Sequence, residues 1–502
     1  MNKKPNILIL FSDQHFSGAI GAYGNQEIKT PNIDSIASDG VLYKNAYCSF
    51  PICTPSRYSL LSGKHTFEHA CWDNFSTLDP TTPTFPKILK QGGYHTKAIG
   101  KMHYVPTYLD VGFDEMILAE QAGEGRWDDD YHRYLKDNDL IDINDFLDQA
   151  GKTSSEYRNQ FSSEYTQKGA STKSNLEEKH HSTTWIADQA INSIKQWSDE
   201  PNLLMASFIK PHHPEDPPAP WDTEYDPKTI KLLPGYLESS LDPENKYAGI
   251  DDSEEKKASE NEDEVRHFLA KYYGTISHLD SHIGRIIKCL KENKQYDNTM
   301  IIYTADHGDY CGYHGMILKC NYMYEPVVKI PMIIKYPGEI KASVNEKFTT
   351  IIDLPITICS QAELQMPKNL SGLNLSTDFE DREYIFSEYG CHEPNKGSMT
   401  MVRDKRFKLI TETSGFPNLF FDLENDPNEV NNLYASAIHQ DKIIEMKKAI
   451  QNWRGEDWYK PTPCDLNAPQ IKQANVPQDI ESHRKEMKAY FKSKIEDFLQ
   501  KN

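Results

Sequence analysis

The 502-residue sequence has no long apolar run and no secretory-type leader pattern. No stretch approaches the ~20 apolar residues that a bilayer-spanning helix needs, so we predict no membrane partner. The apolar run from Ile7 to Phe11 stops at Ser12-Asp13, short of the roughly 7 to 15 apolar residues of a signal peptide. We therefore predict a buried strand here, in a protein that stays in the cytoplasm.

The nine cysteines lack the spacing of a disulfide scaffold or a zinc site. Their number is odd, and no two of them have the CxxC spacing. We predict that most of them are reduced and structural.

Positive charge is scarce, with 55 Lys and Arg against 75 Asp and Glu and a formal charge of −20. Because Lys and Arg supply most of the affinity for phosphate backbones, this balance disfavours a nucleic-acid partner. An anionic substrate remains compatible with it if one pocket concentrates positive charge. Hydrophobic residues make up 38% of the chain, enough for the core of one large or two unequal domains.

Short apolar runs alternate with helical patterns, which is typical of βαβ units and a mostly parallel sheet. Strands are predicted at 6–11, 94–99, 202–209, 299–304 and 330–336, and helices at 30–37, 84–91, 265–292 and 351–358. Residues 105–180 are polar, aromatic and acidic, as in an insertion at a sheet edge that shapes substrate choice. The charge run 251–264 is predicted to be solvated.

The pattern changes near residue 370, so we predict a large α/β domain over 1–370 and a smaller α+β subdomain over 371–502. Strands are predicted in the second part at 384–388, 399–403, 406–410 and 419–423, with helices near 438–453 and 478–500.

Polar residues follow three of the predicted strands: Asp13-Gln14, Lys210-Pro211-His212 and Asp306-His307. Ligands of open α/β sheets bind beyond the carboxyl ends of the strands. The oxygen atoms and the imidazole could therefore converge on one divalent cation. The alternative is that Asp13 caps a turn and that Asp306-His307 forms a hydrogen bond at a helix start.

The run Cys53-Thr54-Pro55-Ser56-Arg57 leads into the helical pattern Tyr58-Ser59-Leu60-Leu61. Cys53 is thereby predicted near a helix N-terminus, where free N–H groups and the dipole favour an anion. Arg57, one turn on, would add a fixed cation. The alternative is a buried structural cysteine.

Cys53, Pro55 and Arg57 match the pattern CxPxR, which resembles the signature of the type I sulfatases of the alkaline phosphatase superfamily. In that family the cysteine is oxidised after synthesis to formylglycine. Further landmarks follow in the family's order over nearly the whole chain. They are Pro5-Asn6-Ile7 with Asp13, Thr30 to Asp34, Gly100-Lys101-Met102-His103, Pro211-His212-His213-Pro214, Asp306-His307-Gly308, His314-Gly315 with Lys319, Leu423 to Glu429 and Asn431-Asn432-Leu433.

The resemblance implies an alkaline-phosphatase-like α/β fold and a formylglycine nucleophile made from Cys53. Hydrated formylglycine attacks sulfur, releases the alcohol and leaves a covalent sulfate ester, from which the remaining hydroxyl expels sulfate. A divalent cation, expected to be Ca²⁺ with Mg²⁺ or Mn²⁺ as alternatives, binds a sulfate oxygen. The implied metal ligands are Asp13, Gln14, Cys53, Asp306 and His307.

The implied catalytic residues are Cys53, Arg57, Lys101, His103, His212 and Lys319. Arg57 and Lys101 would position the formylglycine oxygens, and Lys319 would bind the sulfate and help to protonate the leaving oxygen. His103 resembles the base of the elimination step, and His212 a sulfate contact or the acid for the leaving group. The histidines at 65, 69, 180, 181 and 213 carry no motif and are either structural or substrate-facing.

Two positions depart from the commonest sulfatase pattern, because Gln14 stands where a second aspartate is frequent and His307 where asparagine is frequent. The related phosphonate monoester and phosphodiester hydrolases resemble the chain at these positions. We predict a sulfuric ester hydrolase acting on a carbohydrate or other small organic sulfate, matured by a formylglycine-generating enzyme. The alternatives are a phosphonate monoester or phosphodiester hydrolase and a non-catalytic anion-binding relative.

Overall fold

The structure is a computed structural model that describes residues 4–121, 123, 125–151, 171–236, 261–319, 322–338, 341–390, 398–412, 418–455 and 473–501. Of the predicted charge run 251–264, residues 251–260 lie outside the described residues. Among the helices of the described residues, none combines the length and apolar character needed to cross a bilayer.

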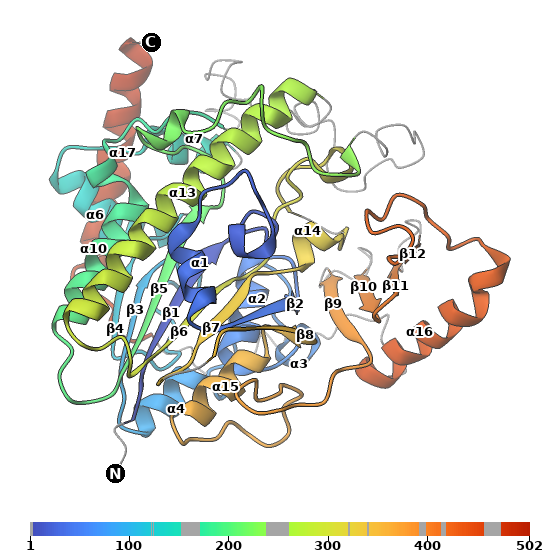
Figure 1. Cartoon of the computed structure of the whole chain (residues 1–502). Coiled ribbons are helices and arrows are strands. Elements are labelled where there is room, and N and C mark those ends of the chain that lie inside the picture. The colour runs from blue at the N-terminus through green and yellow to red at the C-terminus, as the bar shows by residue number, and fades with distance from the viewer. Residues whose placement is uncertain are drawn as a thin grey trace.

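A mixed sheet dominates the described part of the chain (Figure 1). Its eight strands lie in the order β4-β3-β5-β1-β6-β7-β2-β8, and only β7 runs against the others. The bounds are β1 Asn6–Asp13, β2 Val41–Tyr47, β3 His95–Gly100, β4 Glu115–Leu118, β5 Asn202–Pro211, β6 Thr299–Ala305, β7 Met332–Lys335 and β8 Ser343–Thr350. The predicted mostly parallel α/β sheet is confirmed.

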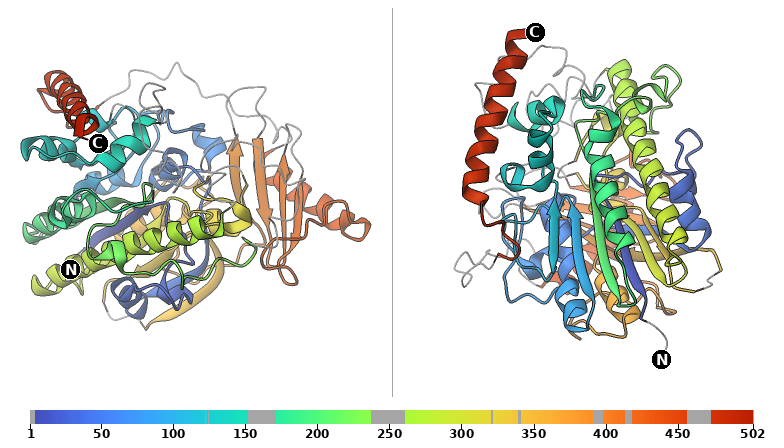
Figure 2. Two further views of the ribbon diagram at one scale, coloured as in Figure 1. Left: turned by 90° about the horizontal axis from the view of Figure 1, so that it is seen from above. Right: turned by 90° about the vertical axis from the view of Figure 1, so that its left-hand side faces the viewer.

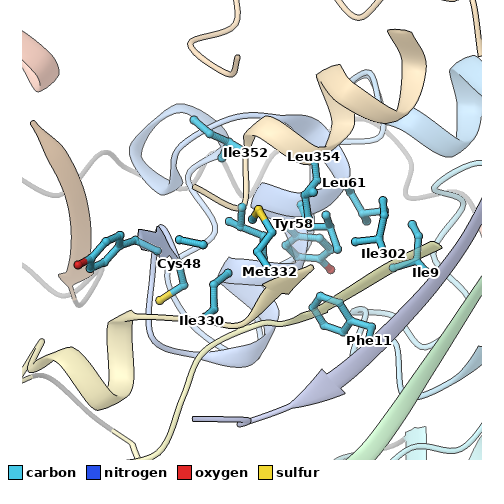
Figure 3. Close-up of a cluster of buried hydrophobic side chains, with 14 of the residues drawn as sticks. Ile9, Phe11, Cys48, Tyr58, Leu61, Ile302, Ile330, Met332, Ile352 and Leu354 are labelled. Carbon is cyan, nitrogen blue, oxygen red and sulfur yellow. The ribbon is translucent and has the colours of Figure 1, made fainter. Parts of the chain in front are cut away.

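Helices cover both faces of this sheet, and β1 shows why. Its side chains alternate between the faces because successive Cβ atoms of a strand point in opposite directions. Ile9 and Phe11 pack with Tyr58, Leu61 and Leu354 from α2 and α15 (Figure 3). Leu8 and Leu10 pack on the other face against α1, α10 and α13. The helices are α1 Pro31–Ser38, α2 Cys53–Ser62, α3 Thr66–His69, α4 Phe85–Gln91, α10 Ser182–Lys195, α13 Glu262–Glu292, α14 Glu325–Val328 and α15 Asp353–Gln361.

Three strands of the sheet, β2, β4 and β8, have no counterpart among the predicted strands. Lys44 in the middle of β2 is exposed, and the first half of β8 is polar and largely exposed at the sheet edge. Since such strands bury only part of one face, their apolar runs are broken and the pattern is weak.

The described residues of the region 105–180, which exclude 122, 124 and 152–170, lie at the opposite edge of the sheet and contain the edge strand β4 and several short helices. These are α5 Gly125–Asp128, α6 Asp130–Asp137, α7 Ile143–Gly151 and the short 3-10 helix η2 Glu178–His180. The last helix, α17 Ile480–Lys501, packs its Met487, Phe491 and Ile495 against Phe146 and its neighbours. The C-terminal end of the chain therefore returns to this edge region.

A second sheet of four antiparallel strands follows, in the order β12-β11-β10-β9. Its strands are β9 Ile385–Gly390, β10 Ser398–Arg403, β11 Phe407–Glu412 and β12 Leu419–Asp422, and α16 Gln440–Arg454 packs on it. Figure 2 shows this sheet and α17 on opposite sides of the molecule. The small C-terminal α+β unit is confirmed, and its boundary near residue 370 stays a prediction.

Candidate active site

The carboxyl ends of neighbouring parallel strands bring Asp13, Lys101 and Asp306 to one place. Asp13 ends β1, Lys101 follows β3 and Asp306 follows β6. The backbone N–H of Gln14 donates to Asp306 Oδ1 over 3.0 Å, and Gln14 adopts the left-handed φ of 62°. The two predicted loops thus lie in direct contact, as expected for strand ends at a sheet crevice.

Cys53 is the first residue of α2 and is fully buried. Its Sγ accepts from Lys319 Nζ at 3.0 Å and lies 3.4 Å from His307 Nε2 and 3.6 Å from Asp13 Oδ1. Burial and Asp13 oppose ionisation, but Lys319, Lys101 and His103 outweigh them and hold the pKa of the Cys53 thiol well below its ordinary value. The helix start thus favours negative charge at this atom.

Arg57 forms ion pairs with both carboxylates, Asp13 and Asp306. Its guanidinium donates to Asp13 Oδ2 at 2.9 Å and to Asp306 Oδ2 at 3.0 Å, and it is almost fully buried. Lys101 Nζ lies 2.7 Å from the same Asp13 oxygen. Two carboxylates, Asp13 and Asp306, thus lie among three cationic side chains, Arg57, Lys101 and Lys319. Positive charge is therefore concentrated here despite the overall charge of −20.

The donor atoms fit a divalent cation. One ligand atom each from Asp13, Cys53, Asp306 and His307 lies within 4.8 Å of the others. His307 directs Nδ1 to the Gly308 carbonyl at 2.9 Å, which leaves Nε2 for the cluster. Gln14 Oε1 is buried and has no hydrogen-bond partner among the described residues. A buried amide oxygen without such a partner, on a residue whose backbone N–H donates to Asp306, is a suitable donor for a divalent cation.

Comparison with known proteins decides the family. The sulfatase family profile matches residues 5–364, and the profile for the C-terminal part of N-sulphoglucosamine sulphohydrolase matches residues 312–456. The chain belongs to the sulfatase family. It is therefore a sulfuric ester hydrolase, as predicted from its motifs.

Two curated relatives of this sulfatase are an arylsulfatase of Clostridium perfringens, 29% identical with 89% of this chain and 94% of the relative covered, and an N-acetylglucosamine-6-O-sulfatase of Bacteroides thetaiotaomicron, 26% identical with 89% and 86% covered. Among solved structures, the phosphonate monoester hydrolase of Agrobacterium radiobacter is similar with a TM-score of 0.73 at 22% identity, covering 94% of this chain and 100% of that chain. The alkaline-phosphatase-like fold is confirmed.

The two remaining predicted catalytic residues of this sulfatase flank the cluster. His103 has the left-handed φ of 54°, and its backbone N–H donates to Glu120. His212 lies just after β5, with Nδ1 2.8 Å from the His213 carbonyl. Burial, together with His213, Lys101 and Lys319, holds the pKa of His212 well below its ordinary value.

The sequence reasoning missed two residues that hold this site together. Asp309 accepts from Gln14 Nε2 at 2.5 Å, and Gln121 accepts from Lys101 Nζ at 3.2 Å. Asp309 lies in the same loop as Asp306, so its position three residues further on was a usable signal. Gln121 follows the edge strand β4, which the sequence pattern did not reveal.

The five histidines without a motif all have protein contacts. His69 Nε2 lies 3.0 Å from Ser59 Oγ, His213 Nδ1 lies 2.6 Å from Asp148, and His180 Nδ1 lies 2.6 Å from the Tyr134 hydroxyl. The rings of His65 and His181 pack against Trp453 and His278. These contacts favour a structural role for the five histidines over a substrate-facing one.

Proposed function

We propose that this sulfatase hydrolyses the sulfate ester of a carbohydrate or other small organic alcohol through a formylglycine made from Cys53. The observation that supports this most directly is the position of Cys53 at the start of α2, in contact with Lys319, His307 and Asp13. An oxygen on the side chain of residue 53 would there face cations and metal ligands together. The predicted cytoplasmic location stays a prediction.

Asp13, Gln14, Asp306 and His307 would hold the divalent cation. When bound, the cation would supply Lewis-acid stabilisation of a sulfate oxygen and lower the pKa of a neighbouring hydroxyl. The oxygen ligands suit Ca²⁺, Mg²⁺ or Mn²⁺. Arg57 would orient Asp13 and Asp306 through its two hydrogen bonds and favour the ionised form of each.

The aldehyde form of residue 53, once hydrated, would supply the hydroxyl that attacks sulfur. Lys101 and the α2 N-terminus would stabilise negative charge on its oxygens. His103, a hydrogen-bond partner of Cys53, would remove the proton from the second hydroxyl when sulfate is expelled.

Lys319 and His212 would act on the sulfate and the leaving group. Lys319 Nζ, 3.0 Å from Cys53 Sγ, would bind a sulfate oxygen as it gains charge. His212 donates its Nδ1 proton to the His213 carbonyl, which leaves Nε2 to accept a proton. A bound anion beside Nε2 raises the pKa of His212 and would allow it to protonate the departing alcohol oxygen.

Phosphonate monoester or phosphodiester hydrolysis is the second candidate, because Gln14 and His307 occur in that branch too. The protein is produced with a formylglycine-generating enzyme, and kcat/KM is measured on an aryl sulfate, an aryl phosphonate monoester and an aryl phosphodiester. We expect the highest value for the sulfate. A higher value for either phosphorus ester would overturn the sulfate assignment.

Two cysteine variants test the nucleophile and exclude a binding protein. Cys53→Ala should lose turnover of the aryl sulfate, whereas Cys359→Ala, which changes a buried free cysteine in α15, should keep it. If Cys53→Ala kept both turnover and ligand affinity, the nucleophile assignment would fail and the anion-binding relative would be favoured.

A further inference from the structure

A second group of metal-type donors lies outside the site described above, on the sheet face covered by α10 and α13 (Figure 1). Glu178 belongs to η2, and Thr184 lies in the first turn of α10. His278 and His282 are four residues apart on α13, so their side chains project from the same face of that helix. The two segments that meet here are about 100 residues apart in sequence.

Four side-chain atoms in this group lie at similar distances from one another. They are Glu178 Oε1, Thr184 Oγ1, His278 Nε2 and His282 Nε2. Glu178 Oε1 lies 2.9 Å from Thr184, 2.9 Å from His282 and 3.6 Å from His278. Thr184 Oγ1 lies 3.0 Å from His282 and 3.4 Å from His278, and the two Nε2 atoms are 3.0 Å apart.

Hydrogen bonding alone does not account for these contacts. An ionised glutamate brings no hydrogen, the threonine hydroxyl brings one, and each Nε2 brings one at most. If both Nε2 atoms carry hydrogens, the two N–H groups oppose each other across 3.0 Å. If one lacks its hydrogen, several of the six contacts place lone pairs against lone pairs. A cation at the centre would satisfy all four atoms together.

The spacing agrees with a tetrahedral ion. Zinc-to-ligand bonds of ~2.0–2.1 Å place tetrahedral ligand atoms roughly 3.3 to 3.4 Å apart, within the range of the six distances above. We propose that Glu178, His278 and His282 bind a Zn²⁺-type transition metal, with the Thr184 hydroxyl at the fourth corner. The site would link η2 and the start of α10 to the middle of α13.

The ligand chemistry selects the class of ion. Two imidazoles and one carboxylate suit Zn²⁺, Co²⁺ or Ni²⁺, whereas Ca²⁺ and Mg²⁺ prefer shells of oxygen. The two histidines are buried, while the Glu178 side chain is 35% exposed and gives an ion access from solvent.

Arg285 is the contact that opposes the ion. Its Nη1 lies 2.9 Å from His282 Nδ1, which must carry a proton when Nε2 binds a metal. The Arg285 side chain is half exposed and also pairs with Asp188, so it can turn toward Asp188 when the ion binds. Replacing Arg285 with Gln would offer His282 Nδ1–H an acceptor and should tighten metal binding.

Titration with Co²⁺ tests the proposal, because four-coordinate Co²⁺ absorbs visible light far more strongly than six-coordinate Co²⁺. In the full-length protein we expect an intense band that Zn²⁺ abolishes by displacement. The band should disappear in His282→Gln and remain in Asp306→Asn, which alters the active-site cluster instead. Arg285→Gln should show a lower Kd for Co²⁺.

His95→Gln is the matched control, because His95 is exposed and lies far from this group in sequence; its band should equal that of the original protein. Circular dichroism verifies that each variant folds. Should His282→Gln fail to fold, Glu178→Gln at the half-exposed position should weaken Co²⁺ binding by roughly tenfold or more. No band in the original protein, or an unchanged band in folded His282→Gln or Glu178→Gln, would overturn the proposal.

Discussion

The two clusters of metal-type donors differ most in the charge around them. At the first, Arg57, Lys101 and Lys319 surround Asp13 and Cys53. At the second, the carboxylate of Glu178 faces two imidazoles and a hydroxyl, and one cation, Arg285, contacts His282 at Nδ1 rather than at the proposed ligand atom Nε2. A site that transfers an anion needs cations beside the metal ligands, whereas an ion that links two helices needs only the ligands. The charge around a metal site therefore distinguishes a proposed catalytic site from a proposed structural one better than the identity of the ligands does.

Two buried carboxyls, Asp13 and Glu388, show how neighbouring cations decide a pKa. Burial raises the pKa of Asp13, but Lys101, Lys319 and Arg57 outweigh it and hold the value well below normal. Glu388 in β9 is also buried, with Arg454 3.2 Å away, and burial dominates there and raises its pKa to about 7. Several converging cations keep Asp13 ionised against the effect of burial, whereas the single Arg454 does not do so for Glu388.

The largest expected effect is that of Asp306→Ala. It removes a proposed metal ligand and leaves the buried Arg57 Nε–H without its acceptor, so we expect turnover to fall by roughly four orders of magnitude together with loss of the active-site metal. Steady-state kinetics measure the turnover, and elemental analysis measures the metal content. Asp378→Ala, at an exposed aspartate, is the control. Full turnover and full metal content in Asp306→Ala would show that the site is misassigned.

Lys319→Ala should lower kcat by roughly 10²- to 10³-fold, because it removes a cation from the place where charge develops. Arginine at this position keeps the charge and should recover part of the loss. Lys44→Ala changes an exposed lysine and should have no effect on kcat. If Lys319→Ala raised KM with kcat unchanged, Lys319 would bind substrate and transition state equally.

Glu388 should make stability fall as pH rises from about 4.5 to about 7. Its folded pKa of about 7 lies above its ordinary 4.5, so the folded state holds the proton longer and the contribution is full only below the ordinary value. The difference is roughly 3 kcal/mol over this window. Urea unfolding at pH 5 and pH 7.5 should show a smaller fall for Glu388→Gln than for the exposed control Glu424→Gln. Equal falls would contradict the assignment.

Asp309→Asn should weaken metal binding at the first cluster by roughly 10- to 100-fold. The Asp309 carboxylate accepts from Gln14 Nε2 and so fixes the orientation of the amide whose Oε1 we propose as a metal ligand. Metal titration of the stripped enzyme measures the affinity, and the Co²⁺ band of the second cluster should not change. Unaltered affinity would mean that Gln14 is not a ligand or does not need this partner.

Part of the first cluster could be predicted from strand ends and a helix start, and the resemblance to the sulfatases supplied the rest, including Lys319. Asp13, Asp306 and Lys101 each come directly after an apolar run, and parallel strands place such residues together. The second cluster could not be predicted, because Glu178 lies in a polar region and meets His278 only when α10 packs beside α13. The strands β2 and β8 were missed for a related reason, since half-exposed strands lack a clear apolar pattern.

The central claim is that turnover depends on conversion of Cys53 to formylglycine. We would measure, in one set of preparations made with varying amounts of a formylglycine-generating enzyme, the mass of the peptide containing Cys53 and the rate on an aryl sulfate. The account predicts a peptide that carries an aldehyde and resists thiol alkylation, and a rate proportional to the converted fraction. Full turnover by protein whose Cys53 is entirely alkylatable would contradict it.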